Sequence, residues 1–433
     1  MYTIARAFGG AMLIILTYFL IRTVFPESAL KRCMTIVLVF TSTYFWGWGS
    51  QIPQVAPLVH MWTELDPLFR LSYIPHHLWS KVFMILTLII FIKFITSKRK
   101  IFFIAACMFG VTAGFISPVV LTTMIPLFVI WLGIELLTNR KNHLRIYIFS
   151  GWIGILVSIS AVAAYHRLVQ QGEFPWTSYL GWEKIQYPVT PFTYFQSLGP
   201  TFLLFLLSIP AIVKMKYTGS LLIAWVLTSW VTLFVLAPYI PLTNSRYLGG
   251  YQFIPIGIGA AIGIAVFSDW MYKTFRVNWK VTTIILIFLF GAYFSIGLWA
   301  SWKEHDGYIS ANRWNIQVFV PDDTWEAITF LSTKKGDDVV VAPLDISTMI
   351  PAFTSHRTVS GHKTITYEYE KKNIDLAEFY GRASHLQAKE FLKIYNVRYA
   401  VQQFPDSVSD RWYEMLGMTK IYTNASVRTY SLP

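Results

Sequence analysis

Long apolar stretches separated by short polar segments fill the first two-thirds of this chain. Most of them approach the roughly 20 residues that an α-helix needs to cross a membrane. The runs lie at about residues 3–21, 33–48, 82–97, 101–117, 118–137, 146–165, 194–213, 219–238, 249–268 and 281–301. Ser117-Pro118 separates two of them, because proline disfavours helical backbone in the residue before it. The pattern predicts an α-helical polytopic membrane protein with about ten transmembrane helices.

After Trp302 the pattern becomes that of a soluble α/β domain. Apolar stretches at 338–343 and 398–402 predict buried strands, and helical spacing at 370–380 and 384–395 predicts two helices between them. Two further signals are a capping aspartate pair and a final hairpin, at Asp322-Asp323 and near 418–431 with its turn at Asn424-Ala425. Strands alternating with helices predict a small sheet flanked by helices.

Composition and charge agree with this division. The chain is 55% hydrophobic and 14% charged, whereas soluble proteins carry about 25% charged residues. Residues 1–302 have a net charge of +14 and residues 303–433 a net charge of −1. The overall charge of +13 therefore belongs to the membrane part and indicates no nucleic-acid partner. We expect a membrane domain over 1–302 and an α/β domain over 303–433.

Lysine and arginine alternate between the loops and so predict an orientation. One set of loops carries fifteen of them: Arg22, Lys31, Arg32, Lys93, Lys98, Arg99, Lys100, Arg140, Lys141, Arg145, Lys214, Lys216, Lys273, Arg276 and Lys280. The opposite set carries five: Arg70, Lys81, Arg167, Lys184 and Arg246. The positive-inside rule assigns the richer set to the cytoplasm. We therefore expect the loops 49–81, 166–193 and 239–248, and the domain after residue 302, to be extracytoplasmic.

Acids and imidazoles gather in the loop 49–81. Glu64 and Asp66 are two residues apart, so in extended backbone they share a face. Such carboxylates take a proton from a sugar hydroxyl or hold a divalent cation against a phosphate. The alternative is a pair of solvated acids, one of which caps a helix beginning at Pro67. His76 and His77 are candidate substrate or metal ligands, although adjacent histidines are expected to point apart and rarely chelate one metal together. The alternative is a structural, hydrogen-bonded histidine.

Two arginines in the expected outer loops are candidate phosphate ligands. Arg246 stands beside Tyr247 in a short aromatic loop, and the guanidinium fork matches phosphate oxygens. Arg70 is a weaker candidate for the same role. Snorkelling of either side chain to the lipid headgroups is the alternative.

Three stretches resemble a family of polytopic membrane glycosyltransferases, the GT-C type that uses polyprenyl-phosphate sugars and includes bacterial aminoarabinose transferases and protein mannosyltransferases. Trp62-x-Glu64 followed by Pro75-His76 is similar to an outer loop of bacterial members. Arg246-Tyr247-Leu248 before an apolar helix resembles their late arginine-aromatic element. The tail resembles their outer C-terminal domain at residues 325–331, 338–343, 350–353, 357–362 and 388–400.

The resemblance implies a function. It implies transfer of a sugar from a polyprenyl-phosphate donor to an acceptor glycan, lipid or protein at the outer face of a plasma or inner membrane. Glu64 and Asp66 would then be catalytic, Arg246, Arg70 and Tyr247 would bind the donor phosphate, and His76 and His77 would contact substrate or metal. A divalent cation is the cofactor that these carboxylates would accommodate.

One departure from the family pattern leaves other functions open. The family begins with a helix and a large outer loop bearing a catalytic acid, whereas Met1–Arg22 resembles a later helix, so we expect a chain without the N-terminal helices and first outer loop. The alternatives are a transporter or flippase of a lipid-linked intermediate, and a non-catalytic subunit of an envelope-assembly complex. Charged rows at mid-membrane, which would favour transport, are not evident.

Overall fold

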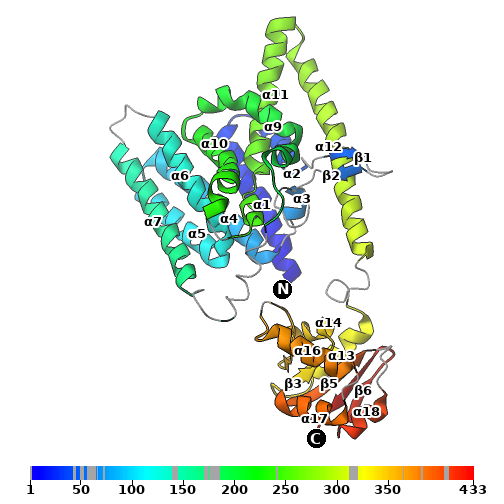
Figure 1. Cartoon of the computed structure of the whole chain (residues 1–433). Helices are drawn as coiled ribbons and strands as arrows, with labels where there is room; N and C mark the ends of the chain where they lie inside the picture. Colours follow the sequence, from blue (N-terminus) through cyan, green and yellow to red (C-terminus); the bar gives the residue numbers. More distant parts are fainter. Residues whose placement is uncertain are drawn as a thin grey trace. The chain divides into compact units, whose positions relative to one another are not determined.

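The computed structural model describes residues 2–41, 45–48, 53–55, 65, 67–71, 74–138, 145–169, 174, 186–239, 242–311, 320–363, 365–381, 384–403 and 409–433 (Figure 1). The chain divides into two compact units. The first comprises Met1–Gln170 with Trp182–Glu304, and the second comprises Gln171–Gly181 with His305–Pro433.

The first unit is a bundle of apolar helices. They are α1 (Tyr2–Val24), α2 (Ala29–Thr41), α4 (Pro75–Ser97), α5 (Lys100–Ile116), α6 (Leu121–Thr138), α7 (Arg145–Val169), α9 (Pro191–Val213), α10 (Lys216–Val231), α11 (Phe253–Phe275) and α12 (Trp279–Ala311). Within the described residues, eight helical segments are long and apolar enough to cross a membrane. The fold is therefore mostly helical, and these helices indicate a membrane protein.

Two of the ten expected spans are shorter helices that are not among these eight segments. Helix α5 has 17 residues and α2 has 13, or ~26 Å and ~20 Å at 1.5 Å per residue. The expected run 33–48 does not continue as helix, because Phe45–Trp48 forms strand β1, which pairs antiparallel with β2 (Pro53–Val55). Aromatic residues around a glycine favour strand over helix there. Ser117 does end α5, and a 3₁₀ turn, η1 (Pro118–Val120), leads into α6.

Helix α4 begins seven residues before the apolar run 82–97 that predicted it. Pro75 occupies its first turn, where the missing N–H costs nothing. His76, His77 and Lys81 are therefore helical residues and not part of a loop. The hydropathy pattern missed this start because the first two turns carry polar side chains, although Ser80 and Lys81 are buried.

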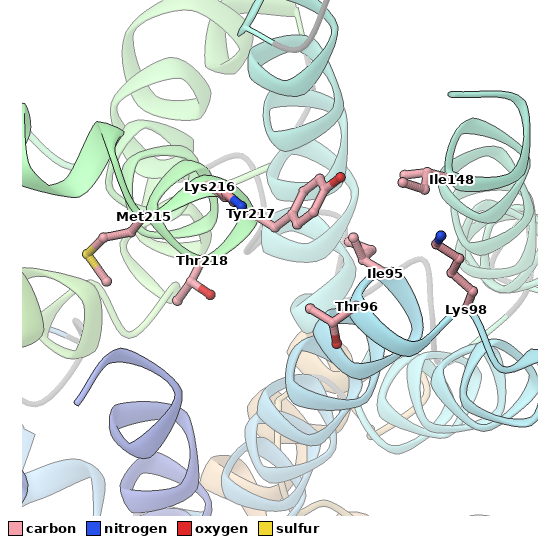
Figure 2. A pocket seen from close by; sticks show the side chains of 8 residues that line it. All are labelled: Ile95, Thr96, Lys98, Ile148, Met215, Lys216, Tyr217 and Thr218. Carbon is pink, nitrogen blue, oxygen red and sulfur yellow. The ribbon is translucent and has the colours of Figure 1, made fainter. Parts of the chain in front are cut away.

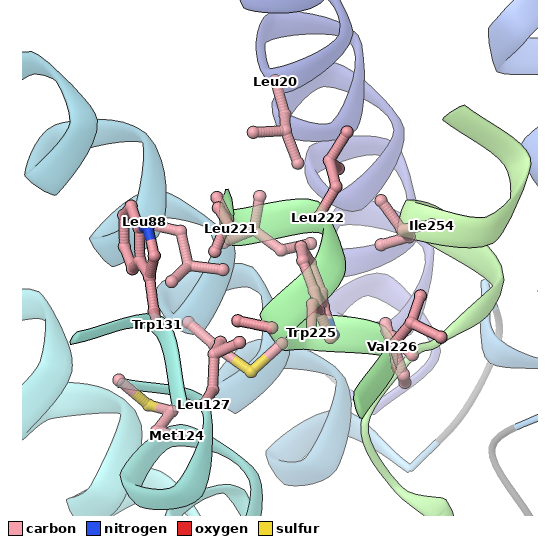
Figure 3. Packing of buried hydrophobic residues seen from close by; sticks show 14 of the residues in the cluster. Leu20, Leu88, Met124, Leu127, Trp131, Leu221, Leu222, Trp225, Val226 and Ile254 are labelled. Carbon is pink, nitrogen blue, oxygen red and sulfur yellow. The ribbon is translucent and has the colours of Figure 1, made fainter. Parts of the chain in front are cut away.

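The core of the first unit lies between α1, α4, α6, α10 and α11. Leu20, Leu88, Trp131, Trp225 and Ile254 meet there, one from each helix (Figure 3). Because all five side chains are almost fully excluded from solvent, their packing fixes how these helices are spaced.

A glycine pair lets α1 approach the start of α4 closely. A Cβ on Gly10 would lie 2.2 Å from the Leu71 carbonyl oxygen, and one on Gly9 would lie 2.8 Å from the Leu78 side chain. Leu71 follows the short helix α3 (Pro67–Arg70) directly. The Trp79 indole also donates to the Ala5 carbonyl at 3.1 Å. The N-terminal ends of α1 and α4 and the end of α3 are thus held together.

The second unit is built on a five-stranded mixed sheet in the order β4-β3-β5-β7-β6. Its strands are β3 (Val339–Val341), β4 (Arg357–Thr358), β5 (Val397–Gln403), β6 (Thr419–Thr423) and β7 (Val427–Ser431). Strand β3 runs parallel to β4 and β5, whereas β5-β7 and β7-β6 are antiparallel pairs. The helices around the sheet are α13 (Asp322–Ser332), α14 (Leu344–Ser347), α15 (Ile350–Phe353), α16 (Tyr369–Tyr380), α17 (His385–Ile394) and α18 (Asp410–Met415).

Side-chain hydrogen bonds close the last hairpin of this unit. The Asn424 Oδ1 atom accepts from the backbone N–H of Val427 at 2.8 Å, as a turn-forming asparagine does. Asp410, at the start of α18, accepts from Lys420, Arg428 and Tyr430 at 2.7, 2.7 and 2.6 Å. These bonds, from Lys420 first and then Tyr430, hold the pKa of Asp410 below its usual value.

Candidate functional site

The backbone from Arg246, in the 3₁₀ turn η4 (Asn244–Leu248), to Gly250, shortly before α11, is held by side chains from three other helices. Four of its carbonyl oxygens, in residues 246–250, accept from these side chains. The bonds are Thr122 to Arg246 at 3.5 Å, Ser229 to Tyr247 at 2.8 Å, Lys81 to Gly249, and Trp225 to Gly250 at 2.5 Å. We call residues 246–250 the clamped turn. Because α4, α6 and α10 all contribute, the turn has little freedom to move independently of the bundle.

Two imidazoles lie at the first turn of α4, close to this segment. The rings of His76 and His77 have centroids 4.2 Å apart and planes inclined by 41°. The expectation that adjacent histidines point apart is therefore wrong here, since the rings lie against each other. The His77 Nδ1 atom is 3.2 Å from the Ser117 hydroxyl, which ties α4 to the turn between α5 and α6.

Cationic side chains surround these imidazoles. Arg246 interacts electrostatically with both rings, and Lys81 and Arg70 interact with His77. The Lys81 ammonium also lies 5.5 Å from the centroid of the Tyr251 ring, in cation–π range. We call Arg70, His76, His77, Lys81 and Arg246 the cationic cluster. Three elements supply it, namely the end of α3, the first two turns of α4, and the clamped turn.

Burial within the cationic cluster is graded. Arg70 and Lys81 are 0% and 1% exposed, Arg246 and His77 are half-buried, and His76 is exposed. Charges interact more strongly where water is excluded, so the buried members raise the positive potential felt at the exposed rim. An anionic group at the His76 and Arg246 rim would be attracted by the charges of Arg70, Lys81 and Arg246, and arginine offers it paired donors.

Sequence reasoning singled out four members of this cluster and overlooked the fifth. Arg246, Arg70, His76 and His77 come together although 176 positions separate Arg70 from Arg246. Lys81 was overlooked because it was treated as a topological charge. Its signal in the sequence is a lysine directly before the apolar run 82–97.

Three further residues were predicted to belong to the site, namely Tyr247, Glu64 and Asp66. Tyr247 is 2% exposed and belongs to the interior beneath the cationic cluster, with its backbone carbonyl held by Ser229. Glu64 and Asp66 lie outside the described residues.

The described members of the cationic cluster do not suit a hard divalent cation. Such ions take oxygen ligands, chiefly carboxylates, whereas the described side chains of the cluster are two imidazoles, two guanidinium groups and an ammonium group. Among the residues that the structure describes, no three His, Cys, Asp or Glu side chains gather to hold a metal. We therefore derive no step through a metal ion.

Comparison with known proteins gives similarity to solved structures only. No protein-family model and no curated protein sequence matches the chain. Crystal structures of the Archaeoglobus fulgidus oligosaccharyltransferase are similar to it. The apo form has a TM-score of 0.44 at 11% identity, over 93% of this chain and 58% of that one. The complex with Zn and sulfate has a TM-score of 0.44 at 12% identity, over 95% and 57%. The chain thus spans less than two-thirds of the length of these structures.

Proposed function

We propose that the chain is a membrane glycosyltransferase of the GT-C type, which moves a sugar from a polyprenyl-phosphate donor to an acceptor hydroxyl. The observation that carries the proposal is the cationic cluster, where cations from three separate elements converge at one end of an apolar helical bundle. A polyprenyl-phosphate sugar combines an apolar chain with an anionic phosphate, and this arrangement offers a counterpart for each. The sequence resemblance of the Arg246-Tyr247-Leu248 stretch supports the same conclusion.

The cationic cluster suits the charge change of this reaction. The acceptor oxygen forms a bond to the sugar C1 atom, and the bond between C1 and the phosphate oxygen breaks. The phosphate leaves with that electron pair, so its charge goes from about −1 to −2. Cations fixed near the leaving oxygen stabilise this transition state more than the ground state. Arg246, at the accessible rim of the cationic cluster, is the cation that we assign to this role, and the neighbouring His76 ring is a hydrogen-bond donor to the same phosphate.

The acceptor hydroxyl must also lose a proton. In our proposal a carboxylate from the segment before α3 takes it, with Glu64 as the first candidate and Asp66 as the second. Both belong to the stretch that continues directly into Arg70. The proton ends on the carboxylate and the products are the glycosylated acceptor and polyprenyl phosphate, so atoms and charge balance.

The test measures release of polyprenyl phosphate from a panel of labelled polyprenyl-phosphate sugars by the reconstituted chain. Arg246→Gln removes the guanidinium but leaves the backbone carbonyl to Thr122, so the clamped turn stays in place. Losing one charge-assisted contact of 1.5–3 kcal/mol should slow release by roughly tenfold to hundredfold. Arg167→Gln, at the exposed end of α7, removes a cation outside the cluster and should have no effect.

Three outcomes distinguish the candidate functions. Release that falls in Arg246→Gln and is abolished in Glu64→Gln, with donor binding retained in the latter, supports the transferase. Equal rates in Arg246→Gln and Arg167→Gln would overturn the assignment of the cluster. Donor binding that depends on Arg246 without release of any product would instead favour a transporter or a non-catalytic subunit.

A further inference from the structure

A cavity with polar and apolar lining lies at the end of the helical bundle opposite the first turn of α4. It has a volume of about 360 Å³ and lies between the end of α4, the start of α7 and the turn that joins α9 to α10. Its lining residues are Ile95, Thr96, Lys98, Ile148, Met215, Lys216, Tyr217 and Thr218 (Figure 2). None of them belongs to the cationic cluster, so this cavity is separate from the proposed active site.

The lining divides by chemistry into two parts. Ile95, Ile148 and Met215 provide apolar walls from α4, α7 and the α9–α10 turn. Two ammonium groups, from Lys98 and Lys216, and the hydroxyl groups of Tyr217 and Thr218 supply the polar part, whereas the Thr96 hydroxyl donates to the Ile92 carbonyl in its own helix. Tyr217 extends from α10 toward Ile95 and Ile148, so that its hydroxyl reaches the side of the cavity where Lys98 lies (Figure 2).

Both lysines lie at helix termini. Lys98 closes α4 with a left-handed backbone at φ 59°, and Lys216 opens α10 at φ 53°. Both side chains are exposed to solvent at these helix termini. The sequence adds further basic residues to these connections, namely Arg99 and Lys100 after Lys98, and Arg140, Lys141 and Arg145 ahead of Ile148.

Among the described residues, Glu135 is the acidic side chain that interacts with this lining. The buried Glu135 carboxylate accepts a hydrogen bond from Ser220 on α10 and interacts electrostatically with Tyr217. It does not line the cavity. The charge offered to a ligand at the mouth is therefore positive.

We propose that this cavity binds the phosphate group of an anionic phospholipid. Lysines act as point charges for phosphate, and hydroxyl groups donate to its oxygens. The apolar walls match the first carbons of the acyl chains, which free phosphate lacks. Basic pockets between membrane helices bind lipid headgroups by this combination. The expected role is to hold α4, α7 and α10 together at the end opposite the cationic cluster.

The experiment compares charge variants of the full chain in detergent. Lys98→Gln/Lys216→Gln removes both cavity ammonium groups. Lys93→Gln/Lys214→Gln removes two exposed lysines, one in the last turns of α4 and one at the end of α9, that do not line the cavity. Each protein is titrated with phosphatidylglycerol, phosphatidylcholine or inorganic phosphate. The rise in Tm is followed by tryptophan fluorescence, and retained lipid is counted by native mass spectrometry.

We expect phosphatidylglycerol to raise the Tm of the wild type and of the Lys93/Lys214 variant. The Lys98/Lys216 variant should need roughly tenfold more lipid for the same rise, since each lysine contributes on the order of a few-fold in affinity. An equal effect of inorganic phosphate that is lost in the same variant supports the phosphate site and assigns it to free phosphate. Identical behaviour of the two double variants would overturn the proposal. Their Tm values without lipid report whether both are folded.

Discussion

Replacing Lys81 by methionine tests whether the buried part of the cationic cluster serves ligand binding or only the fold. Methionine keeps most of the apolar stem that α4 buries, and it removes the ammonium group. The Gly249 carbonyl then loses its donor, and Tyr251 loses its cation. We expect the clamped turn to loosen and the affinity for polyprenyl phosphate to fall about tenfold, or about 1.4 kcal/mol.

Opposing terms make the expected change in stability small. The lost hydrogen bond from a charged donor is worth about 1.5–3 kcal/mol, and the lost cation–π contact about 0.5–2 kcal/mol. Removing the Lys81 ammonium group, which is 1% exposed and close to Arg70 and Arg246, offsets part of this loss of stability. The reason is that an ammonium group is costly to desolvate among like charges. The free energy of unfolding should therefore fall by less than about 2 kcal/mol, while one attractive charge is lost from the binding site without compensation.

The assay measures the Kd for polyprenyl phosphate and the Tm of the same preparations. Lys93→Met is the matched control, because Lys93 is an exposed lysine about three turns further along α4. A Kd that stays at the wild-type value in Lys81→Met while the Tm drops would refute the reasoning, and Lys81 would then be a structural residue only.

Two further predictions concern other parts of the molecule. Gly10→Ala places a Cβ 2.2 Å from a backbone carbonyl oxygen and should cost about 1–3 kcal/mol of stability, read as a lower Tm. Gly133→Ala, which meets nothing within 4 Å, should leave the Tm unchanged or slightly raised. In the second unit, the lowered pKa of Asp410 means that its bonds stabilise the fold above the unfolded-state pKa near 4, and this stability is lost as pH falls through the lower folded value. Unfolding followed between neutral and acidic pH should show a loss of stability in this range that Asp410→Asn flattens, and identical pH profiles would contradict the assignment.

The elements that sequence reasoning predicted well are those with a single dominant signal. Long apolar runs predicted the membrane helices, and helical spacing at 384–395 predicted α17, whose start the structure shows to be capped by reciprocal bonds between Ser384 and Gln387. The prediction of a helix over the whole run 33–48 was wrong, because hydropathy does not distinguish an aromatic strand from a helix over a few residues. The start of α4 was missed for the opposite reason, since polar side chains that pack inward resemble a loop in a hydropathy pattern.

The candidate site was only partly predictable, because its geometry depends on contacts between distant segments. Arg246 and His76 could be named from residue type and local surroundings. That Arg246 interacts with both imidazoles follows from the packing of α4 against the clamped turn, and no local pattern encodes it. Lys81 illustrates the limit best, since the same lysine serves as a snorkelling anchor on one side of a helix and as a buried donor on another.

The clamped turn has a practical consequence for handling the protein. Its four carbonyl acceptors depend on donors from α4, α6 and α10, so the position of Arg246 depends on the spacing of three helices at once. A detergent that loosens the lateral packing of the bundle would release this turn before any helix melts. Retention of helical circular dichroism is then an insufficient criterion for a competent preparation, and solubilisation conditions should be ranked by ligand affinity.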